Sequence, residues 1–147
     1  MKQIIILTIL FVLIVAGFIL IRSAKPAKVR NSAIKVGSVV FRVDVADNFA
    51  SRAQGLSGRT MLNGDQGMLF IFPVPGPYSF WMKGMNFPID IIWISDKKVI
   101  GFAENVPVPS GVSVSTVSPP GMVDQALEIS AGLVKQRGIK VGDEVAF

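Results

Sequence analysis

The 147-residue chain contains no cysteine and no histidine. It therefore lacks thiolate nucleophiles, the commonest general base and the usual ligands of zinc and copper. A lipoprotein anchor on a modified cysteine is excluded for the same reason. Any chemistry must come from carboxylates, Lys, Arg, one Tyr, hydroxyls and the backbone, and a bound metal would be a hard ion with oxygen ligands. We expect no metal site and no cofactor.

Acidic residues are absent from the first 35 positions, although six of the fifteen Lys and Arg residues lie there. The rest of the chain carries nine cations against all ten Asp and Glu residues, so it is close to neutral. A nucleic-acid-binding domain normally presents a basic face. We therefore expect no nucleic-acid partner and assign the net charge of +5 to the N-terminal segment.

Charge is also absent from residues 4–21, an apolar run of eighteen residues interrupted by Thr8 and Gly17. A helix of this length just crosses about 30 Å of hydrocarbon. A cleaved signal peptide is the alternative, but the run is longer than its usual apolar core and Arg22 or Lys25 interrupts the cleavage site. We predict a retained transmembrane anchor over residues 1–21, followed by a basic linker over residues 22–35 that lies against anionic membrane lipid.

The orientation of this anchor is ambiguous in the sequence. Cations after the apolar run outnumber Lys2 before it, and the positive-inside rule would then keep the rest of the chain in the cytoplasm. A small domain behind an N-terminal anchor is instead typical of export. The absence of cysteine fits both compartments.

Residues 36–147 carry the pattern of a mainly β domain. Residues 41–45 alternate between apolar and charged, and three runs rich in aromatic and β-branched residues follow at 67–72, 78–83 and 89–94. We expect further strands at 99–104, 123–129 and 144–147, a tight turn at 95–98 and a long loop over 107–121. The expected fold is a β-sandwich or barrel of six to seven short strands with two short helices.

The two helices are expected where capping residues precede helical spacing. An Asp-Asn pair at positions 47–48 can cap the first, in which Phe49, Ala53 and Leu56 recur on one side. Ser130 can cap the second, over residues 131–137, and Gly138 would end it.

Six motifs occur in one order along the chain: F-R-V-D-V-A (41–46), R-A-Q-G-L (52–56), G-M-L-F-I-F (67–72), F-W-M-K (80–83), P-I-D (88–90) and G-D-E-V (142–145). In this order they resemble the domain-of-unknown-function family 192 over residues 38–147. The resemblance implies a mainly β sandwich and, because members often follow export signals or anchors, an extracytoplasmic domain of a single-pass membrane protein. The chain departs from the family pattern at Gly84-Met85, where Asn-Thr is usual, and at Ser57, where Met is usual.

Candidate ligand-binding residues lie in the aromatic runs and at a glycine-rich turn. Trp81 and Lys83 alternate onto one side of the strand expected at 78–83, where an aromatic plane beside a cation suits a planar or sugar-like ligand with an anionic group. Alternatively, Trp81 packs in the core and Lys83 pairs with Asp90. Arg52 and Arg59 flank the turn and can bind a carboxylate or phosphate, or merely stabilise a helix end. The surrounding Met and Phe residues are interpreted as core packing.

Two carboxylates, Asp90 and Glu128, interrupt otherwise apolar strands. Together they could act as acid and base in glycoside hydrolysis, or each could face solvent from the outer side of its strand. Three functions therefore stay open: a binding module for a small ligand or an envelope polymer, a structural or assembly partner at the membrane, and a carboxylate-dependent hydrolase. A concave pocket would favour the first and a flat apolar patch the second.

Overall fold

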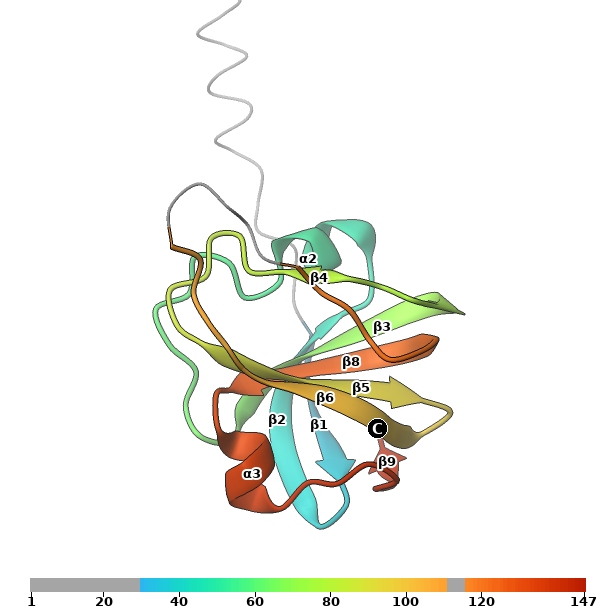
Figure 1. The fold of residues 1–147 in the computed structure, drawn as a ribbon. Helices are drawn as coiled ribbons and strands as arrows, with labels where there is room; N and C mark the ends of the chain where they lie inside the picture. Colours follow the sequence, from blue (N-terminus) through green and yellow to red (C-terminus); the bar gives the residue numbers. More distant parts are fainter. Residues whose placement is uncertain (1–29, 111–115) are drawn as a thin grey trace, which may run out of the picture.

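Nine strands and two helices are formed by residues 30–110 and 116–147, the part of the chain that the computed structural model describes (Figure 1). Seven strands make one curled sheet in the order β6-β5-β8-β3-β2-β1-β9. Only the β2–β3 pair is parallel among these neighbours. The mainly β prediction is confirmed. The bounds are β1 (Arg30–Val36), β2 (Val39–Ala46), β3 (Gln66–Gly76), β5 (Ile89–Ser95), β6 (Lys98–Val106), β8 (Val123–Ser130) and β9 (Val145–Ala146).

The two edges of the curled sheet are joined near its C-terminal residues. β9 pairs with β1, and the same segment also hydrogen bonds with the other edge. The amide of Val99 donates to the carbonyl of Asp143 over 3.0 Å, and the amide of Val145 donates to the carbonyl of Lys97 over 2.8 Å. Backbone groups that would otherwise form two open edges therefore have partners at this end.

Two hydrophobic cores lie on the two faces of the sheet. The first fills the inside of the curl and includes Phe41, Leu69 and Ile92. The second covers the outer face of β3, β8 and β5, where helix α2 (Phe49–Gln54) and strand β4 (Phe80–Trp81) pack over it. Both faces of β5 are thus covered, which explains why residues 89–94 are apolar almost without alternation.

The N-terminal boundary of the domain differs from the prediction. β1 takes in the last six residues of the expected basic linker, and it pairs with β2 from Arg30 to Val36. Within residues 31–36, only Ile34 and Val36 are buried, with exposed Lys35 between them, so the strand pattern is too short to stand out in the sequence. The predicted anchor lies outside the described residues. Within those residues, no helix has the length and apolar character needed to cross a membrane.

Helix α2 follows the capping prediction, although most of the residues at helical spacing are exposed. Asn48 caps it, because its side chain accepts the amide of Ser51 over 3.0 Å and the Ser51 hydroxyl contacts the Asn48 amide in return. Of the three residues at helical spacing, only Leu56 is buried. Phe49 is 83% exposed and Ala53 is exposed as well.

Helix α3 (Leu133–Arg137) is capped by a different residue than expected. Ser130 is the last residue of β8, and its hydroxyl donates to the carbonyl of Leu62. The amides at the start of α3 are instead bound by the carboxylate of Asp90, which comes from β5. Gly138 ends the helix in the left-handed conformation, as predicted.

The connections after β3 follow the prediction in part. Asp96 and Lys97 have φ values of 48° and 58°, the left-handed values of a tight hairpin turn. The strand expected over residues 78–83 is reduced to Phe80 and Trp81, which pair with β7 (Thr116–Val117). β7 lies in a segment that was expected to be loop, since a two-residue strand leaves no periodicity in a Pro- and Ser-rich sequence.

Candidate functional site

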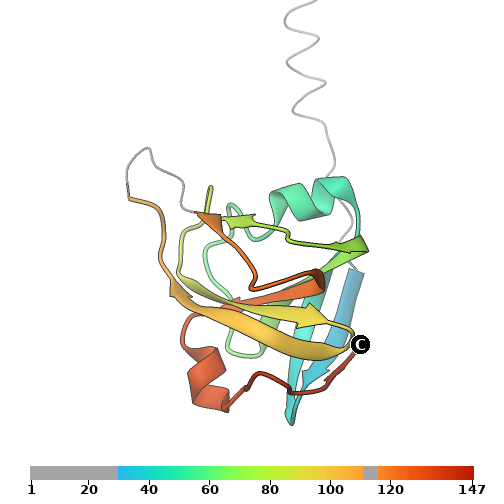
Figure 2. The same ribbon diagram turned by 45° about the vertical axis from the view of Figure 1, so that its right-hand side comes forward.

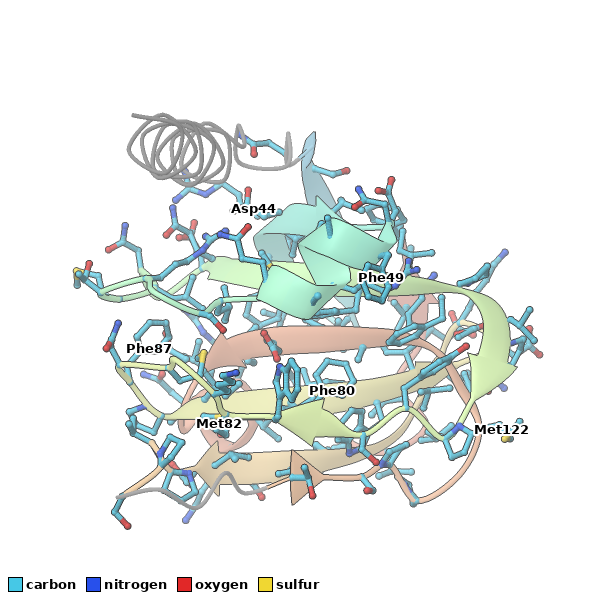
Figure 3. The ribbon with its side chains drawn as sticks, turned by 90° about the horizontal axis from the view of Figure 1, so that it is seen from above. Asp44, Phe49, Phe80, Met82, Phe87 and Met122 are labelled. Carbon is cyan, nitrogen blue, oxygen red and sulfur yellow. The ribbon has the colours of Figure 1, made fainter. Side chains whose placement is uncertain are left out.

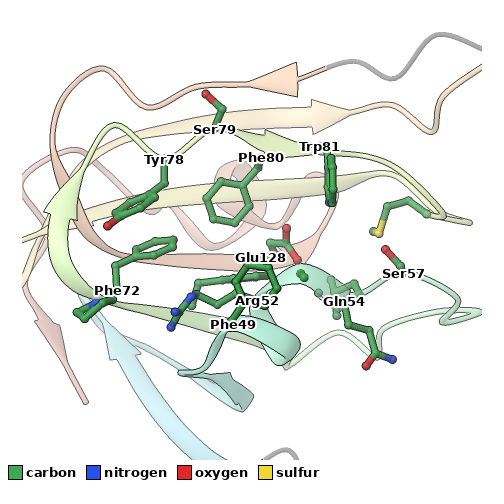
Figure 4. Close-up of a pocket in the computed structure, with 16 residues that line it drawn as sticks. Phe49, Arg52, Gln54, Ser57, Phe72, Tyr78, Ser79, Phe80, Trp81 and Glu128 are labelled. Carbon is green, nitrogen blue, oxygen red and sulfur yellow. The ribbon is translucent and has the colours of Figure 1, made fainter. Parts of the chain in front are cut away.

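A pocket of about 500 Å³ lies between α2 and the β4 segment, over the outer face of β3 and β8 (Figure 4). Viewed from above, α2 and β4 lie on opposite sides of it, and the strands of the curled sheet pass beneath (Figure 3). Its volume is within the range of small-molecule sites, which are typically concave and mostly apolar. The aromatic residues that line it are Phe49, Phe70, Phe72, Tyr78, Phe80 and Trp81.

The aromatic wall is held in a fixed arrangement. Phe72 and Tyr78 stack with ring centroids 3.8 Å apart, and Phe72 meets the edge of Phe80 at 6.2 Å. The Tyr78 hydroxyl donates to the carbonyl of Val74 over 2.7 Å. Gly76 makes this packing possible, because a Cβ at that position would lie 2.9 Å from the Tyr78 ring. The rings therefore have little freedom to close the pocket.

Glu128 lies on the floor of the pocket. It projects from β8 on the same face as its partners Met68 and Ile91, is 5% exposed, and its Oε2 has no hydrogen-bond partner among the described residues. Burial raises the pKa of its carboxyl to about 8, against the opposing effect of the Arg59 charge. The carboxyl is therefore mainly neutral at pH 7 and carries one O–H donor.

Arg52 stands in the α2 wall of the pocket. Its Nη1 donates to the carbonyl of Ile71 over 2.9 Å, and its guanidinium carbon is 5.9 Å from the centroid of Phe72. A guanidinium has five N–H donors, so further donors remain for a ligand. Phe49 and Ala53 line the same wall, which means that the apolar side of α2 faces the pocket instead of the core.

Trp81 and Lys83 lie together at the mouth, as their spacing predicts. Trp81 is 52% exposed, and the Nζ of Lys83 is 5.8 Å from its ring centroid. Phe80 and Met82, which alternate with them along the chain, are buried. The alternative in which Trp81 packs in the core is therefore wrong.

Asp90 has a structural role on the other face of the sheet. It is fully buried and accepts the amides of Asn105, Gly132 and Val134 over 2.7, 3.0 and 2.9 Å. These bonds replace the ion pair with Lys83 that the sequence left open. Asp90 and Glu128 are both buried. The alternative in which each carboxylate faces solvent from its strand is therefore wrong.

The two carboxylates do not form a catalytic pair. Ile91 is the residue of β5 directly opposite Glu128, so Asp90 and Glu128 project from opposite faces of the sheet. Acid-base hydrolysis needs both groups on one scissile bond. The part of the chain that the structure describes also contains no cluster of acidic residues able to hold a metal ion.

Arg59 belongs to a second and smaller pocket. Its Nη2 pairs with Oδ2 of Asp44 over 2.6 Å, and that pocket, of about 250 Å³, is lined mainly by polar residues of β1, β2 and β3. The predicted site residues thus divide into three groups. Arg52, Trp81 and Glu128 line the aromatic pocket, Lys83 lies beside Trp81, and Arg59 and Asp90 lie elsewhere.

The departures from the family pattern meet at one end of the aromatic pocket. The Ser57 hydroxyl donates to the carbonyl of Lys83 over 2.7 Å, and the amide of Gly58 donates to the carbonyl of Gly84 over 2.8 Å. Gly84 has a φ of 72°, and a Cβ there would lie 3.2 Å from the Cβ of Ser57. These contacts join the loop after α2 to the loop after β4, so they connect the two walls.

Several pocket residues were not predicted as site residues. Phe70, Phe72 and Phe80 were interpreted as core packing, and Phe49 only as one of three residues at helical spacing. Phe70 and Phe80 are indeed buried, but they also line the pocket. The signal available in the sequence was the high number of aromatic residues in two short runs, 67–72 and 78–83, which is more than packing of one covered sheet face needs.

Two solved structures share this fold. The crystal structure of a protein of unknown function from Novosphingobium aromaticivorans is 31% identical, with a TM-score of 0.76, and covers 85% of this chain and 94% of its own. A "putative transcription regulator" from Sinorhizobium meliloti is 28% identical, with a TM-score of 0.73, and covers 83% of this chain and 97% of its own. A comparison with curated proteins found no match. The model of DUF192, described as an uncharacterised ACR, matches residues 32–147, and the chain therefore belongs to this domain-of-unknown-function family.

Proposed function

We propose that the domain is a binding module for a small, largely planar and uncharged ligand, held in the aromatic pocket between α2 and β4. The observation that carries this proposal is Glu128, a buried carboxyl with an unpaired Oε2 on the floor of a pocket lined by aromatic rings. Sites of this kind combine apolar walls with a few convergent polar groups that orient the ligand.

Two features of the pocket are unfavourable in themselves and would be relieved by a ligand. A buried polar group without a partner costs about 1–3 kcal/mol. In addition, Phe49 and Ala53 have helical core spacing but are exposed along the pocket wall. A ring between the aromatic side chains would cover these residues, and an oxygen atom on the ring would bond to Glu128.

The charges around the pocket favour an uncharged ring with an acceptor oxygen. A neutral Glu128 donates its proton, so it suits a carbonyl or ether oxygen. A cationic ligand would be repelled by Arg52 in the wall and by Arg59, whose charge acts on Glu128. An anionic group would lose its hydration in this apolar site, although it would be tolerated at the mouth, beside Lys83.

An assembly role at the membrane is the second candidate, favoured by the exposure of Phe49 and Trp81 at the mouth. The concave pocket, of about 500 Å³, suits a small molecule better than an envelope polymer. The S. meliloti relative is described as a transcription regulator only in provisional terms, and the near-neutral charge after residue 35 gives no support to DNA binding here. A hydrolase is not proposed, because Asp90 and Glu128 lie on opposite faces.

The proposal is tested with a matched series of naphthalene compounds added to the full chain in lipid nanodiscs: 1,4-naphthoquinone, 2-naphthoate and 2-naphthylmethylammonium. Without cysteine, the chain offers no thiol that would react with the quinone. A ligand that binds only the folded state raises its stability, by about 2.7 kcal/mol at a hundredfold excess over Kd. We expect the quinone to raise the thermal midpoint more than either charged compound.

A pocket-filling variant provides the control. Ala53 is exposed on the pocket wall, so the bulky ring system of Ala53→Trp should fill the pocket, and Ala53→Ser should leave it open. The quinone should stabilise the wild type and Ala53→Ser but not Ala53→Trp. Equal shifts in all three proteins, or no shift with any compound, would contradict the proposal.

A further inference from the structure

The pocket mouth lies at the end of the domain where the N-terminal segment enters. From this placement we infer that the mouth rests on the lipid bilayer and that the ligand is a lipid-soluble molecule which enters from the bilayer. The inference deepens the proposed function and rests on it, and it also rests on the transmembrane anchor predicted over residues 4–21. It holds for either orientation of the anchor.

The pairing of β1 with β2 fixes the place where the N-terminal segment joins the domain. Arg30, the first residue of β1, pairs with Val45 near the end of β2, and α2 begins at Phe49, shortly after β2 ends. β1 accordingly begins at the end of the domain that carries α2 (Figure 2). Eight residues, 22–29, separate the apolar run from Arg30, and fully extended they reach at most about 30 Å. The start of β1, at the α2 end of the domain, is therefore held within about 30 Å of the end of the apolar run.

The side chains at the mouth have the chemistry of a membrane interface. Phe49 is 83% exposed and Trp81 is 52% exposed, one from each wall of the pocket. The ammonium of Lys83 lies beside the Trp81 ring. Aromatic rings combined with Lys side chains are typical of the headgroup region, where the ring stays partly apolar and the charge stays wet.

Charge complementarity supports an anionic lipid surface as the partner of the pocket mouth. Residues 22–29 contain three cations and no acid, and Arg52 and Lys83 add positive charge at the mouth. Acids at this end include Asp47, which precedes α2 and contacts the side chain of Asn48, and Asp44, which pairs with Arg59. Anionic headgroups attract such basic segments.

The pocket itself fits an amphiphile that comes from the bilayer. Its lining is mainly apolar and includes six aromatic residues, and its floor offers one hydrogen-bonding group, the carboxyl of Glu128. A planar head with an acceptor oxygen would occupy the floor. An apolar tail would pass between Phe49 and Trp81 into the lipid, so no long tail-binding tunnel is required.

The test uses the two tryptophans of the chain, both of which lie in the domain. Trp81 is at the mouth, whereas Trp93 is 1% exposed within the second core. The full chain is reconstituted in vesicles of phosphatidylcholine with a minor fraction of phosphatidylglycerol, and the phosphatidylcholine is replaced by a form brominated on its acyl chains. We expect bromolipid to remove most of the Trp81 emission, and to have little effect on Trp81→Phe, in which Trp93 alone emits.

Matched variants locate the contact. Phe49→Ser and Lys83→Glu should weaken the quenching. Val40→Ser, at the start of β2 and thus at the other end of the domain, removes a similarly exposed apolar side chain and should not. For the ligand, a prenylated naphthoquinone dissolved in the vesicles should raise the thermal midpoint of the wild type but not of Ala53→Trp.

Each outcome decides between the claims. The inference is overturned if bromolipid quenches the wild type no more than it quenches Trp81→Phe. If soluble 1,4-naphthoquinone still stabilises the protein in that case, the proposed function stands. Quenching without stabilisation by either quinone overturns the proposed function, and the bilayer ligand with it. If light scattering of the detergent-solubilised chain shows a dimer that Phe49→Ser dissociates, the mouth is an interface between copies and the inference is wrong.

Discussion

The carboxyl of Glu128 couples stability to pH. Burial raises its pKa to about 8, whereas its value in an exposed chain is 4.5. Between these values the unfolded chain releases the proton and the folded chain keeps it, so the free energy of unfolding falls as pH rises, by at most about 1.4 kcal/mol per pH unit. We predict that Glu128→Gln loses this decline in urea unfolding measurements between pH 5 and pH 8.

Because the chain has no histidine, the pH dependence of unfolding reports mainly on Glu128. Apart from the α-amino group, few groups of the chain titrate in that window. The wild type and Glu128→Gln should therefore have similar stability near pH 5 and diverge toward pH 8, with the variant more stable. Parallel declines in the two proteins would show that Glu128 does not keep its proton in the folded state.

Asp90 stabilises the fold through backbone amides and not through Lys83. Asp90→Ala leaves three amides without their acceptor, at a cost of about 1–3 kcal/mol for each one that stays buried. Lys83→Ala changes a surface position and should alter stability by less than about 0.5 kcal/mol. Denaturant unfolding of both variants and the double mutant should show near-zero coupling. A coupling above about 1 kcal/mol would restore the ion pair that the sequence left open.

At the scale of elements, the closure of the curled sheet by β9 is the feature most open to test. Val145 is buried in the first core, whereas its neighbour Ala146 is exposed. We predict that Val145→Asp destabilises the domain by about 3 kcal/mol or more, because it buries an unpaired charge, and that Ala146→Asp changes stability by less than about 0.5 kcal/mol. Urea unfolding monitored by circular dichroism measures both, and similar effects at the two positions would contradict the closure.

The element predictions succeeded where a local signal was strong. The Asp-Lys turn at residues 96–97 and the glycine after α3 require special backbone angles, and the structure has them there. The start of β1 and the short strand β7 were missed because neither carries enough alternating residues. α2 was found by its cap and its spacing, but the spacing did not show that Phe49 and Ala53 face a pocket. Amphipathic spacing indicates an apolar neighbour and does not distinguish a core from a ligand site.

At the scale of the whole molecule, the missing information was which segments cover which face. β5 and β8 are buried on both sides because the curl encloses one face while α2 and β4 cover the other. Nothing local in the sequence reveals this, so it stayed open whether Asp90 and Glu128 form a catalytic pair or each face solvent. Arg52, Trp81 and Glu128 were predicted individually, and the fold brings them to one pocket. The aromatic wall was not predicted, because its residues also satisfy a core pattern.

The pH dependence of quinone binding tests the central claim most directly. The full chain in nanodiscs is titrated with 1,4-naphthoquinone by calorimetry between pH 6 and pH 9.5, so that binding follows the ionisation of Glu128. Arg52 and Tyr78 are the other ionisable groups that line the pocket, and the charge of Arg59 acts on Glu128. Because the O–H donor is lost on ionisation, the account predicts that the wild-type Kd rises above about pH 8 while the Kd of Glu128→Gln stays constant. A wild-type affinity that is unchanged or stronger at high pH would contradict it.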